Sequence, residues 1–407
     1  MNGKVRFPLT AQIFVGMVLG IIVGGVIGPP AGSIKFIGDI FIKLLQVVVI
    51  PLIFLVLATG TASLGDPRKI GRLGGKVLLI YEFTSLIAIT LGLLLANLIQ
   101  PGKGLPQPPP GAVKPPTPMG GLQLFMSIFP SNPIDAMARG DTMQVVVFAI
   151  LFGVALGMAG ERARGVMRAL EQLNEVFLHL VRIVVSLAPF GVFALMAWTT
   201  GTMGLRVLLP LGKYLFGIAL ACLFMIFIVS GLLVRFVAKL SVVQFFRHSW
   251  NYMLVAFSTC SAAAALPLEF QAAQKMGIRR EIYNFTLPLG AMNQDGTALY
   301  QAMAAVLIAQ FFGIDLTFAQ QFFVLLLALL ASSGTFAVPG AGLVTLMIVL
   351  RGLGLPLEGI ALVAGVDRIA DMFRTTLNVV DDMACTLAVA ATEKAVNPDV
   401  FYGRQPE

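Results

Sequence analysis

Charged residues are scarce in this chain, and their scarcity excludes an ordinary soluble domain. Of 407 residues, 12% are Asp, Glu, Lys or Arg and 57% are hydrophobic, whereas soluble domains carry about a quarter charged residues. The mean hydropathy is +0.89. These values indicate a protein that resides in a lipid bilayer.

Cysteine and histidine are also few, which narrows the chemistry available. The cysteines Cys222, Cys260 and Cys385 lie in apolar or small-residue segments without CxxC or Cys/His spacing, so a disulfide framework and a zinc site are disfavoured. The two histidines, His179 and His248, lie outside the polar motifs of the chain. An intramembrane hydrolase with a serine nucleophile and a histidine base is therefore an alternative with little support.

Long apolar windows recur along the chain and exclude a single membrane anchor. They predict spanning helices at Leu9–Ile27, Ile37–Ala58, Val77–Leu98, Met143–Met158, Ile183–Trp198 and Tyr214–Val234, with more towards the C-terminus. Basic residues cluster in alternate connections, which by the positive-inside rule face the cytoplasm. We expect a multi-pass protein of the cell membrane, inner or plasma, with both termini cytoplasmic. The net charge of +8 reports this topology, and no nucleic-acid partner is expected.

The C-terminal part of the chain differs from the rest because polar residues, glycines and prolines interrupt its apolar windows. Two interruptions resemble one another, Ser258–Pro267 and Ser332–Gly342. Unsatisfied backbone is tolerated at membrane depth only where it is buried in protein or lines a cavity. Paired interruptions of this kind predict two re-entrant helical hairpins, each followed by a longer helix, with a transporter binding site between them. The alternative is two loops with ordinary turn chemistry.

A stripe of polar residues follows one face of the last predicted helix, between Val366 and Ala391. Helical spacing places Asp367, Asp371, Arg374, Asn378 and Asp382 on that face. An ionisable side chain at the bilayer centre costs about 3 kcal/mol on the more lenient insertion scale, so the stripe needs a compensating reason.

An acidic amino acid is one such reason. Arg374 offers a planar fork suited to a carboxylate, and Asp371, one turn earlier, can accept hydrogen bonds from an ammonium group. The alternative is an internal salt bridge of Arg374 with Asp371, which would leave Asn378 and Asp382 unexplained.

A third interruption, Thr286–Thr297, contains Pro288, Gly290 and Gly296 and the acidic Asp295. Unwinding there would free backbone carbonyls beside a carboxylate, and hard cations favour such oxygen ligands. Far upstream, Tyr81–Ser85 adds hydroxyls from another helix. This combination predicts a cation site.

Four of these motifs together resemble the dicarboxylate/amino acid:cation symporter family, which includes archaeal aspartate transporters and excitatory glutamate transporters. The motifs are the first hairpin ending at Leu266-Pro267, Asn293-Gln-Asp-Gly-Thr297, Ala337-Val-Pro-Gly-Ala-Gly342 and Asp371-Met-Phe-Arg-Thr-Thr-Leu-Asn378. The resemblance covers essentially the whole chain. It implies an all-α membrane protein with eight transmembrane helices and two re-entrant hairpins, assembled as a homotrimer with a transport domain that moves like an elevator.

The resemblance also implies a division of the chain. Residues 1–75 would form scaffold helices 1–2, and residues 121–207 would form scaffold helices 4–5. Residues 76–120 would form transport-domain helix 3 with a proline-rich extracellular loop, and residues 208–240 would form transport-domain helix 6. Residues 241–407 would form the transport core, which consists of hairpin 1, helix 7, hairpin 2 and helix 8.

Site residues follow from the same resemblance. The substrate would be bound by Ser261, Thr297, Val338, Gly340, Asp371, Arg374, Thr375 and Asn378. Two or three sodium ions per substrate would be bound by Gly290, Asn293, Asn378 and Asp382; by Tyr81, Thr84, Ser85, Asn293 and Asp295; and by Ser332, Ser333 and Thr335 with a carbonyl near Met292. Because this chain has both Arg374 and Asp371, the resemblance favours aspartate or glutamate as the substrate.

The chain departs from the family pattern at Gln294, where Met is usual, in a segment before Asn293 that is one residue shorter, and at Ala262–Ala265, where hydroxyls are common. By the resemblance, the first two changes fall in the segment that would couple substrate binding to sodium binding. The expected function is sodium-coupled uptake of an acidic amino acid. A proton-coupled glutamate symporter, a C4-dicarboxylate symporter and a passive anion channel stay open as alternatives.

Overall fold

The computed structural model describes residues 9–63, 67–103, 105, 129–139, 142–291, 293–332 and 341–404. Helices account for nearly all of the regular structure in these ranges, and no strand occurs in them beyond an isolated bridge between Ile278 and Val396. The predicted all-α class is confirmed. The number of membrane crossings and the re-entrant hairpins stay predictions.

The α-helices and their bounds are α1 (Leu9–Ile27), α2 (Lys35–Ser63), α3 (Pro67–Ile99), α5 (Pro133–Arg139), α6 (Thr142–Ala159), α7 (Arg164–Ser186), α8 (Ala188–Met203), α9 (Leu208–Phe224), α10 (Ser230–Leu232), α11 (Val242–Thr259), α12 (Ala262–Lys275), α13 (Arg280–Gly290), α14 (Asp295–Phe311), α15 (Phe318–Ser332), α16 (Ala341–Gly352), α17 (Ile360–Ala364), α18 (Asp367–Thr392) and α19 (Pro398–Phe401).

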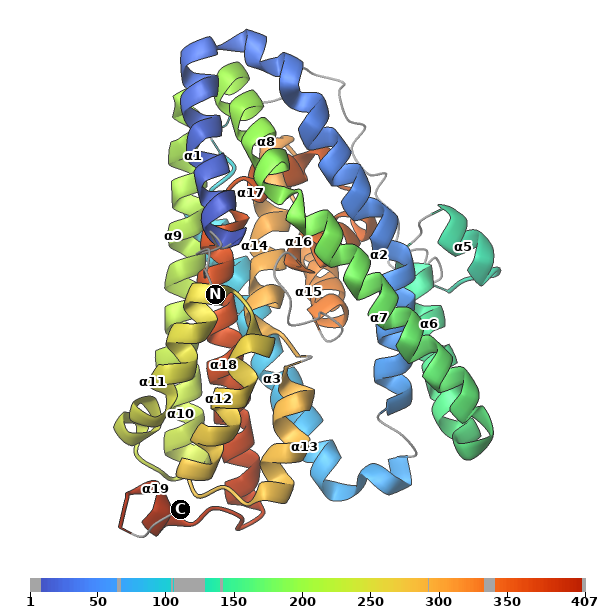
Figure 1. The fold of residues 1–407 in the computed structure, drawn as a ribbon, viewed down its shortest axis with the longest axis vertical. Coiled ribbons are helices and arrows are strands. Elements are labelled where there is room, and N and C mark those ends of the chain that lie inside the picture. The colour runs from blue at the N-terminus through green and yellow to red at the C-terminus, as the bar shows by residue number, and fades with distance from the viewer. Residues whose placement is uncertain are drawn as a thin grey trace, which may run out of the picture.

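The helices form two packed groups. In the outer group, α1 packs on α8, and α2 packs on α6, α7 and α8. In the inner group, α18 runs through the middle and contacts α3, α9, α11, α12, α13 and α14. Figure 1 shows α2 and α7 running diagonally along one side, with α18 enclosed on the other. Contacts between the groups include those of α16 with α2 and α6.

Outer helices α1 and α8 approach closely because glycines remove side chains from their contact. A Cβ atom at Gly16 or Gly20 would lie 2.5 Å from the carbonyl oxygen of Pro189 or Phe193. Small residues spaced four apart let helix backbones meet in a bilayer, where packing rather than the hydrophobic effect holds helices together. The remaining face of α1 carries exposed apolar side chains, including Phe14 and Leu19.

Two helices of the described chain are long and apolar enough to cross a bilayer, Gly74–Ile99 and Leu205–Val237. The second is a continuous rod in which α9 and α10 alternate with two π-helical stretches, Met225–Val229 and Leu233–Val237. One predicted span is divided: the apolar window Ile183–Trp198 crosses a break at Leu187, where α7 ends and α8 begins. Pro189 explains the break, because it has no N–H to donate to the preceding helix.

Candidate functional site

The predicted polar helix is α18, the helix that the inner group surrounds. Its observed bounds, Asp367–Thr392, agree with the window predicted from the sequence. Its charged side chains are buried, with Arg374 and Asp382 each 1% exposed. A charge in such an environment costs several kcal/mol unless a partner compensates it, so the partners of these groups decide what the helix can do.

Arg374 is held by two carboxylates of its own helix. Its Nε donates to Asp371 Oδ1 at 2.8 Å, and its Nη1 donates to Asp367 Oδ1 at 3.1 Å. The guanidinium carbon also lies 4.2 Å from the centre of the Tyr300 ring. Thr375 donates its hydroxyl to Asp371 Oδ1 at 3.0 Å. The internal salt bridge weighed as an alternative is therefore present, and it includes Asp367 as well as Asp371.

Glycines bring two other helix ends against Arg374. A Cβ at Gly296, in the first turn of α14, would lie 2.7 Å from the Arg374 Cα. A Cβ at Gly342, in the first turn of α16, would lie 2.5 Å from Nη1 of the same arginine. Thr297 follows Gly296, and its hydroxyl donates to Gln294 Oε1 at 3.0 Å. The guanidinium thus lies where the starts of α14 and α16 meet α18.

The first predicted hairpin corresponds to α11 and α12, which pack on each other and are joined at Cys260 and Ser261. Cys260 adopts a left-handed backbone with φ of 52°, and the Ser261 hydroxyl caps α12 by accepting a hydrogen bond from Ala264 N at 3.3 Å. The turn lies against α18, because Arg368 donates to the Thr259 carbonyl at 3.5 Å. Ser261 is accordingly a helix cap near the start of α18.

The second predicted hairpin corresponds to α15 and α16. Ser332 ends α15 and is fully buried, with its hydroxyl donating to the Leu329 carbonyl at 3.0 Å. The other predicted ligands of this segment lie outside the described residues, as does Met292; they are Ser333, Thr335, Val338 and Gly340.

The predicted helix interruption before Asp295 is observed. The chain leaves helical structure after Gly290 and resumes it at Asp295. In between, the Asn293 amide donates to Ser85 Oγ at 3.1 Å and to Asp295 Oδ1 at 3.3 Å. The Ser85 hydroxyl makes a short hydrogen bond to the same oxygen of Asp295. One oxygen-rich cluster therefore joins α3 to the start of α14.

Thr84, the neighbour of Ser85 on α3, is 1% exposed and donates to the Tyr81 carbonyl at 2.9 Å.

Asn378 and Asp382 lie on the next turns of α18. The Asn378 amide oxygen accepts from the backbone N–H of Gly296 at 2.8 Å, which ties α14 to α18. A Cβ at Gly290 would meet the carboxylate of Asp382 and the hydroxyl of Tyr81. The structure thus brings together all the predicted cation ligands that it describes on α3, α13, α14 and α18, while Ser332 lies on α15.

Four buried acids of the inner group have no basic partner in the described part of the chain: Glu269, Asp295, Asp381 and Asp382, each at most 2% exposed. The buried ion pairs within the described ranges are those of Arg368 and Arg374 with Asp367 and Asp371. Both carboxylate oxygens of Glu269, and Oδ2 of Asp295 and of Asp382, accept no hydrogen bond from any described residue. Such a core requires positive charge from elsewhere.

Sequence reasoning missed Glu269 and the part played by Asp381. Glu269 follows the Leu266-Pro267 motif in an otherwise apolar and small-residue segment, and its isolation there was the available signal. Asp381 was visible in the sequence but lay off the stripe that the helical spacing defined.

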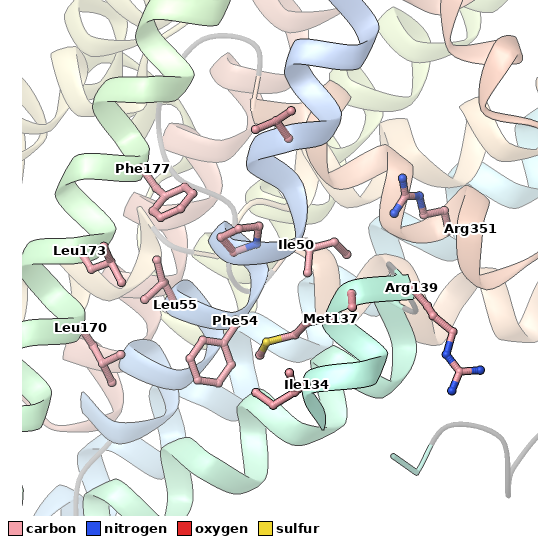
Figure 2. Close-up of a pocket in the computed structure, with 13 residues that line it drawn as sticks. Ile50, Phe54, Leu55, Ile134, Met137, Arg139, Leu170, Leu173, Phe177 and Arg351 are labelled. Carbon is pink, nitrogen blue, oxygen red and sulfur yellow. The ribbon is translucent and has the colours of Figure 1, made fainter. Parts of the chain in front are cut away.

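A separate pocket of 730 Å³ lies among α2, α5 and α7. Figure 2 shows its apolar lining, which comes from α2 (Ile50, Phe54 and Leu55), α5 and α7. Arg351 of α16 lies at one end. The pocket holds none of the polar groups described above, so it is distinct from the site around α18.

These observations define a class: a helical membrane protein whose interrupted helices surround a buried core with an excess of acidic groups. The sequence of the chain also assigns the protein to a family. A profile of the sodium:dicarboxylate symporter family matches residues 9–392, and the chain belongs to that family. The resemblance noted from the motifs is confirmed. The family comprises transporters, so the protein is not an enzyme and the hydrolase alternative is wrong.

Proteins similar to this chain are described as transporters that differ in substrate and coupling ion. A proton/sodium-glutamate symport protein of Bacillus caldotenax is 35% identical, covering 97% of this chain and 96% of the relative. A proton/glutamate-aspartate symporter of Escherichia coli (strain K12) is 34% identical over 96% and 94%. A C4-dicarboxylate transport protein of Bacillus subtilis (strain 168) is 33% identical over 95% and 93%. These relatives are proteins of membrane transport, and this chain is likewise a multi-pass membrane protein.

Proposed function

We propose that the protein is a secondary active symporter that couples sodium entry to the uptake of an acidic amino acid, aspartate or glutamate. Among the relatives are symporters for glutamate and aspartate and carriers for C4-dicarboxylates, which supports the broader class of dicarboxylate or acidic amino acid symporter. The observation that carries the proposal is the charge distribution around α18. One arginine is shared by two carboxylates, and four further acids have no basic partner in the described chain.

Arg374 and Asp371 support an amino acid as the substrate. The carboxylates that hold the guanidinium occupy the positions that a substrate carboxylate would take, and a side-chain carboxylate of aspartate can replace one of them bidentately. Asp371 is then released to accept the substrate ammonium group. A C4-dicarboxylate has no ammonium group and would leave Asp371 with Arg368, at 3.6 Å, as its only basic partner among the described residues.

The remaining substrate contacts follow from the family motifs. Thr297, Thr375 and Asn378 would line the pocket on α14 and α18, while Ser261 and the backbone of Val338 and Gly340 would close it from the two hairpins. The starts of α14 and α16 support this placement, because both lie against Arg374.

The unpaired acids support coupling to cations. Two sodium ions would bind where the described oxygens gather, one at Gly290, Asn293, Asn378 and Asp382 and the other at Tyr81, Thr84, Ser85, Asn293 and Asp295. A third would bind at Ser332, Ser333 and Thr335. Carboxylate, carbonyl and hydroxyl oxygens are the ligands that hard cations prefer. Protons neutralise carboxylates too, so proton-coupled uptake is the second candidate.

The two helix groups support an elevator mechanism. We propose that residues 1–75 and 121–207 form the scaffold of a homotrimer in the cell membrane, with both termini in the cytoplasm. The segments 76–120, 208–240 and 241–407 would form the transport domain, and α18 with its partners lies within them. The hairpins α11–α12 and α15–α16 would be re-entrant and gate the substrate.

Uptake into proteoliposomes tests the proposal. The purified protein is reconstituted, radiolabelled L-aspartate, L-glutamate or succinate is added outside, and a sodium, proton or potassium gradient is imposed. Accumulation of aspartate above its outside concentration with a sodium gradient is the expected result. Accumulation that needs only a proton gradient favours the second candidate. Succinate accumulation without aspartate accumulation contradicts the assigned substrate, and flux that stops at equal concentrations indicates a passive channel.

A further inference from the structure

Asp381 is a buried acid that neither the substrate site nor the sodium sites described above use. It is 2% exposed. Its Oδ1 accepts a hydrogen bond from the Ser230 hydroxyl at 3.3 Å, and its Oδ2 accepts from the Cys385 thiol at 3.5 Å. These two donors are neutral, and no basic side chain of the described chain pairs with Asp381.

The carboxyl group of Asp381 joins the cluster around Asp295. The two carboxyl groups lie close enough to interact electrostatically, and the Thr84 side chain lies close to both. Asp295 is 1% exposed, and its Oδ1 takes the hydrogen bonds from Ser85 and Asn293. Its Oδ2 is buried and accepts no hydrogen bond from the described residues. Two carboxylates side by side, one with an unsatisfied oxygen, repel each other unless positive charge lies between them.

The backbone of the helix containing α9 and α10 explains how Ser230 reaches this cluster. Ser230 lies between the π-helical stretches Met225–Val229 and Leu233–Val237, and its hydroxyl is 3.3 Å from the carbonyl of Met225, five residues earlier. π-Helical turns are rare and occur frequently at functional sites. Both π-helical stretches and α10 contact α18. A regular α-helix would rotate the following residues relative to α18, so the distortion sets the position of this hydroxyl.

We propose that Asp381 and Ser230 are ligands of the same cation as Asp295, so that one monovalent cation is held between two carboxylates. The occupant is a hard cation of the sodium class, because the convergent groups are carboxylate and hydroxyl oxygens contributed by α3, α10, α14 and α18. This inference rests on the proposed sodium coupling. It adds a second full negative charge to a cation site that the family motifs supply with one. The second charge raises the affinity of the site for its cation.

The test compares Asp381→Asn with the wild-type full-length protein. In detergent without substrate, sodium chloride raises the Tm of the wild type relative to choline chloride at equal ionic strength, since the ion binds only the folded protein. Asp381→Asn reduces that rise, and the second proposed sodium site, which includes Asp382, supplies what remains. In proteoliposomes, the sodium concentration for half-maximal aspartate uptake increases by about tenfold, the effect of one weakened ligand contact. The KM for aspartate at saturating sodium stays within about twofold of the wild-type value.

Three further variants separate a ligand from a structural group. Ser230→Ala removes a neutral ligand and increases the half-saturating sodium concentration by about threefold, and it serves as the main test if Asp381→Asn does not fold. Asp381→Glu keeps the charge and restores part of the sodium response. Asp39→Asn removes a partly exposed acid that pairs with Lys35 at 2.9 Å in the outer group, and it leaves the response unchanged.

The outcomes are distinguishable. If Asp381→Asn and Ser230→Ala keep the wild-type half-saturating sodium concentration and the wild-type Tm response, the inference is wrong; this result is expected if a proton bridges the two acids, because asparagine mimics the protonated form. A Tm lowered equally in sodium and in choline assigns Asp381 a structural role and also overturns it. A wild-type protein that does not respond to sodium overturns the proposed coupling together with this inference.

Discussion

The outer and inner helix groups use their polar side chains differently. In the outer group, short hydroxyl hydrogen bonds return to the same helix: Thr59 donates to the Leu55 carbonyl and Thr202 to the Trp198 carbonyl, both at 2.7 Å. The Thr200 hydroxyl donates to the Met196 carbonyl of its own helix at 2.8 Å and lies 3.4 Å from the Ile21 carbonyl of α1. In the inner group, side chains also bond across helices, as when Gln301 donates to Thr345 Oγ1 at 2.7 Å and Thr386 to Thr286 at 2.8 Å. A hydroxyl satisfied within its helix is compatible with lipid or plain packing. Polar contacts between helices hold those helices in one particular packing. The inner group contains both these contacts and the four acids that lack a basic partner among the described residues.

The sharpest test of this difference is removal of the inner arginine. Arg374→Cys leaves Asp367 and Asp371 without their shared partner and removes the proposed carboxylate fork. We expect aspartate uptake to fall by at least about 100-fold, since truncating one member of a buried charge pair costs about 2–5 kcal/mol. Arg206→Cys removes an exposed arginine and is expected to retain uptake. Undiminished aspartate uptake by Arg374→Cys, measured on protein that stays monodisperse, would refute the substrate assignment.

Asp371 distinguishes an amino acid from a plain dicarboxylate. Asp371→Ala removes the proposed acceptor for the ammonium group while Arg374 keeps Asp367 as a partner. We expect aspartate to compete about 100-fold less well for uptake, a loss of about 2.7 kcal/mol, while succinate binding changes little or improves. Thr376→Ala is the matched control, because Thr376 lies on the same helix but bonds to the Met372 carbonyl at 2.8 Å. An equal loss for both ligands would assign Asp371 to the structure of the helix alone.

The next largest expected effect is a loss of stability when the close contact between the start of α14 and α18 is disturbed. Gly296→Ala places a methyl group 2.7 Å from the Arg374 Cα, and the backbone has to shift. We expect a destabilisation of about 1–3 kcal/mol, observed as a lowered Tm, with a raised KM for aspartate. Gly75→Ala on α3 has no atom within 4 Å of the new methyl and is expected to be neutral or slightly stabilising. Equal Tm values for the two variants would show that α14 does not lie against α18 as described.

The same comparison explains how far the sequence alone could reach. Apolar runs and their Gly, Pro and Ser interruptions predicted the bounds of α18, the break between Gly290 and Asp295 and the turn at Cys260, because each is decided by local backbone preferences. Helical spacing placed Asp367, Asp371 and Arg374 on one face but could not say which carboxylates hold the arginine.

Contacts between distant helices were beyond the sequence. Ser230 reaches Asp381 only through π-helical turns, and no local pattern in an apolar helix specifies these. Glu269 carried no motif. The glycines of α1 contact α8, which lies far away in the sequence, so the sequence alone could not show that their spacing allows these two helices to pack closely.

The smallest expected effect on uptake comes from a change in the pocket lined by α2, α5 and α7, which Arg351 of α16 borders. Ile50 lines it from α2 and Arg351 from α16, which belong to the proposed scaffold and transport domain. If α16 moves past α2 during transport, a bulky side chain at Ile50 obstructs the movement but leaves the substrate site intact. We expect Ile50→Trp to lower the maximal rate of aspartate uptake by about threefold, which corresponds to a barrier higher by about 0.65 kcal/mol, with an unchanged KM. Val26→Trp, on a side chain of α1 that is 81% exposed, controls for tryptophan in the bilayer. A changed KM with an unchanged rate would place the pocket on the binding pathway and contradict a sliding contact between the two groups.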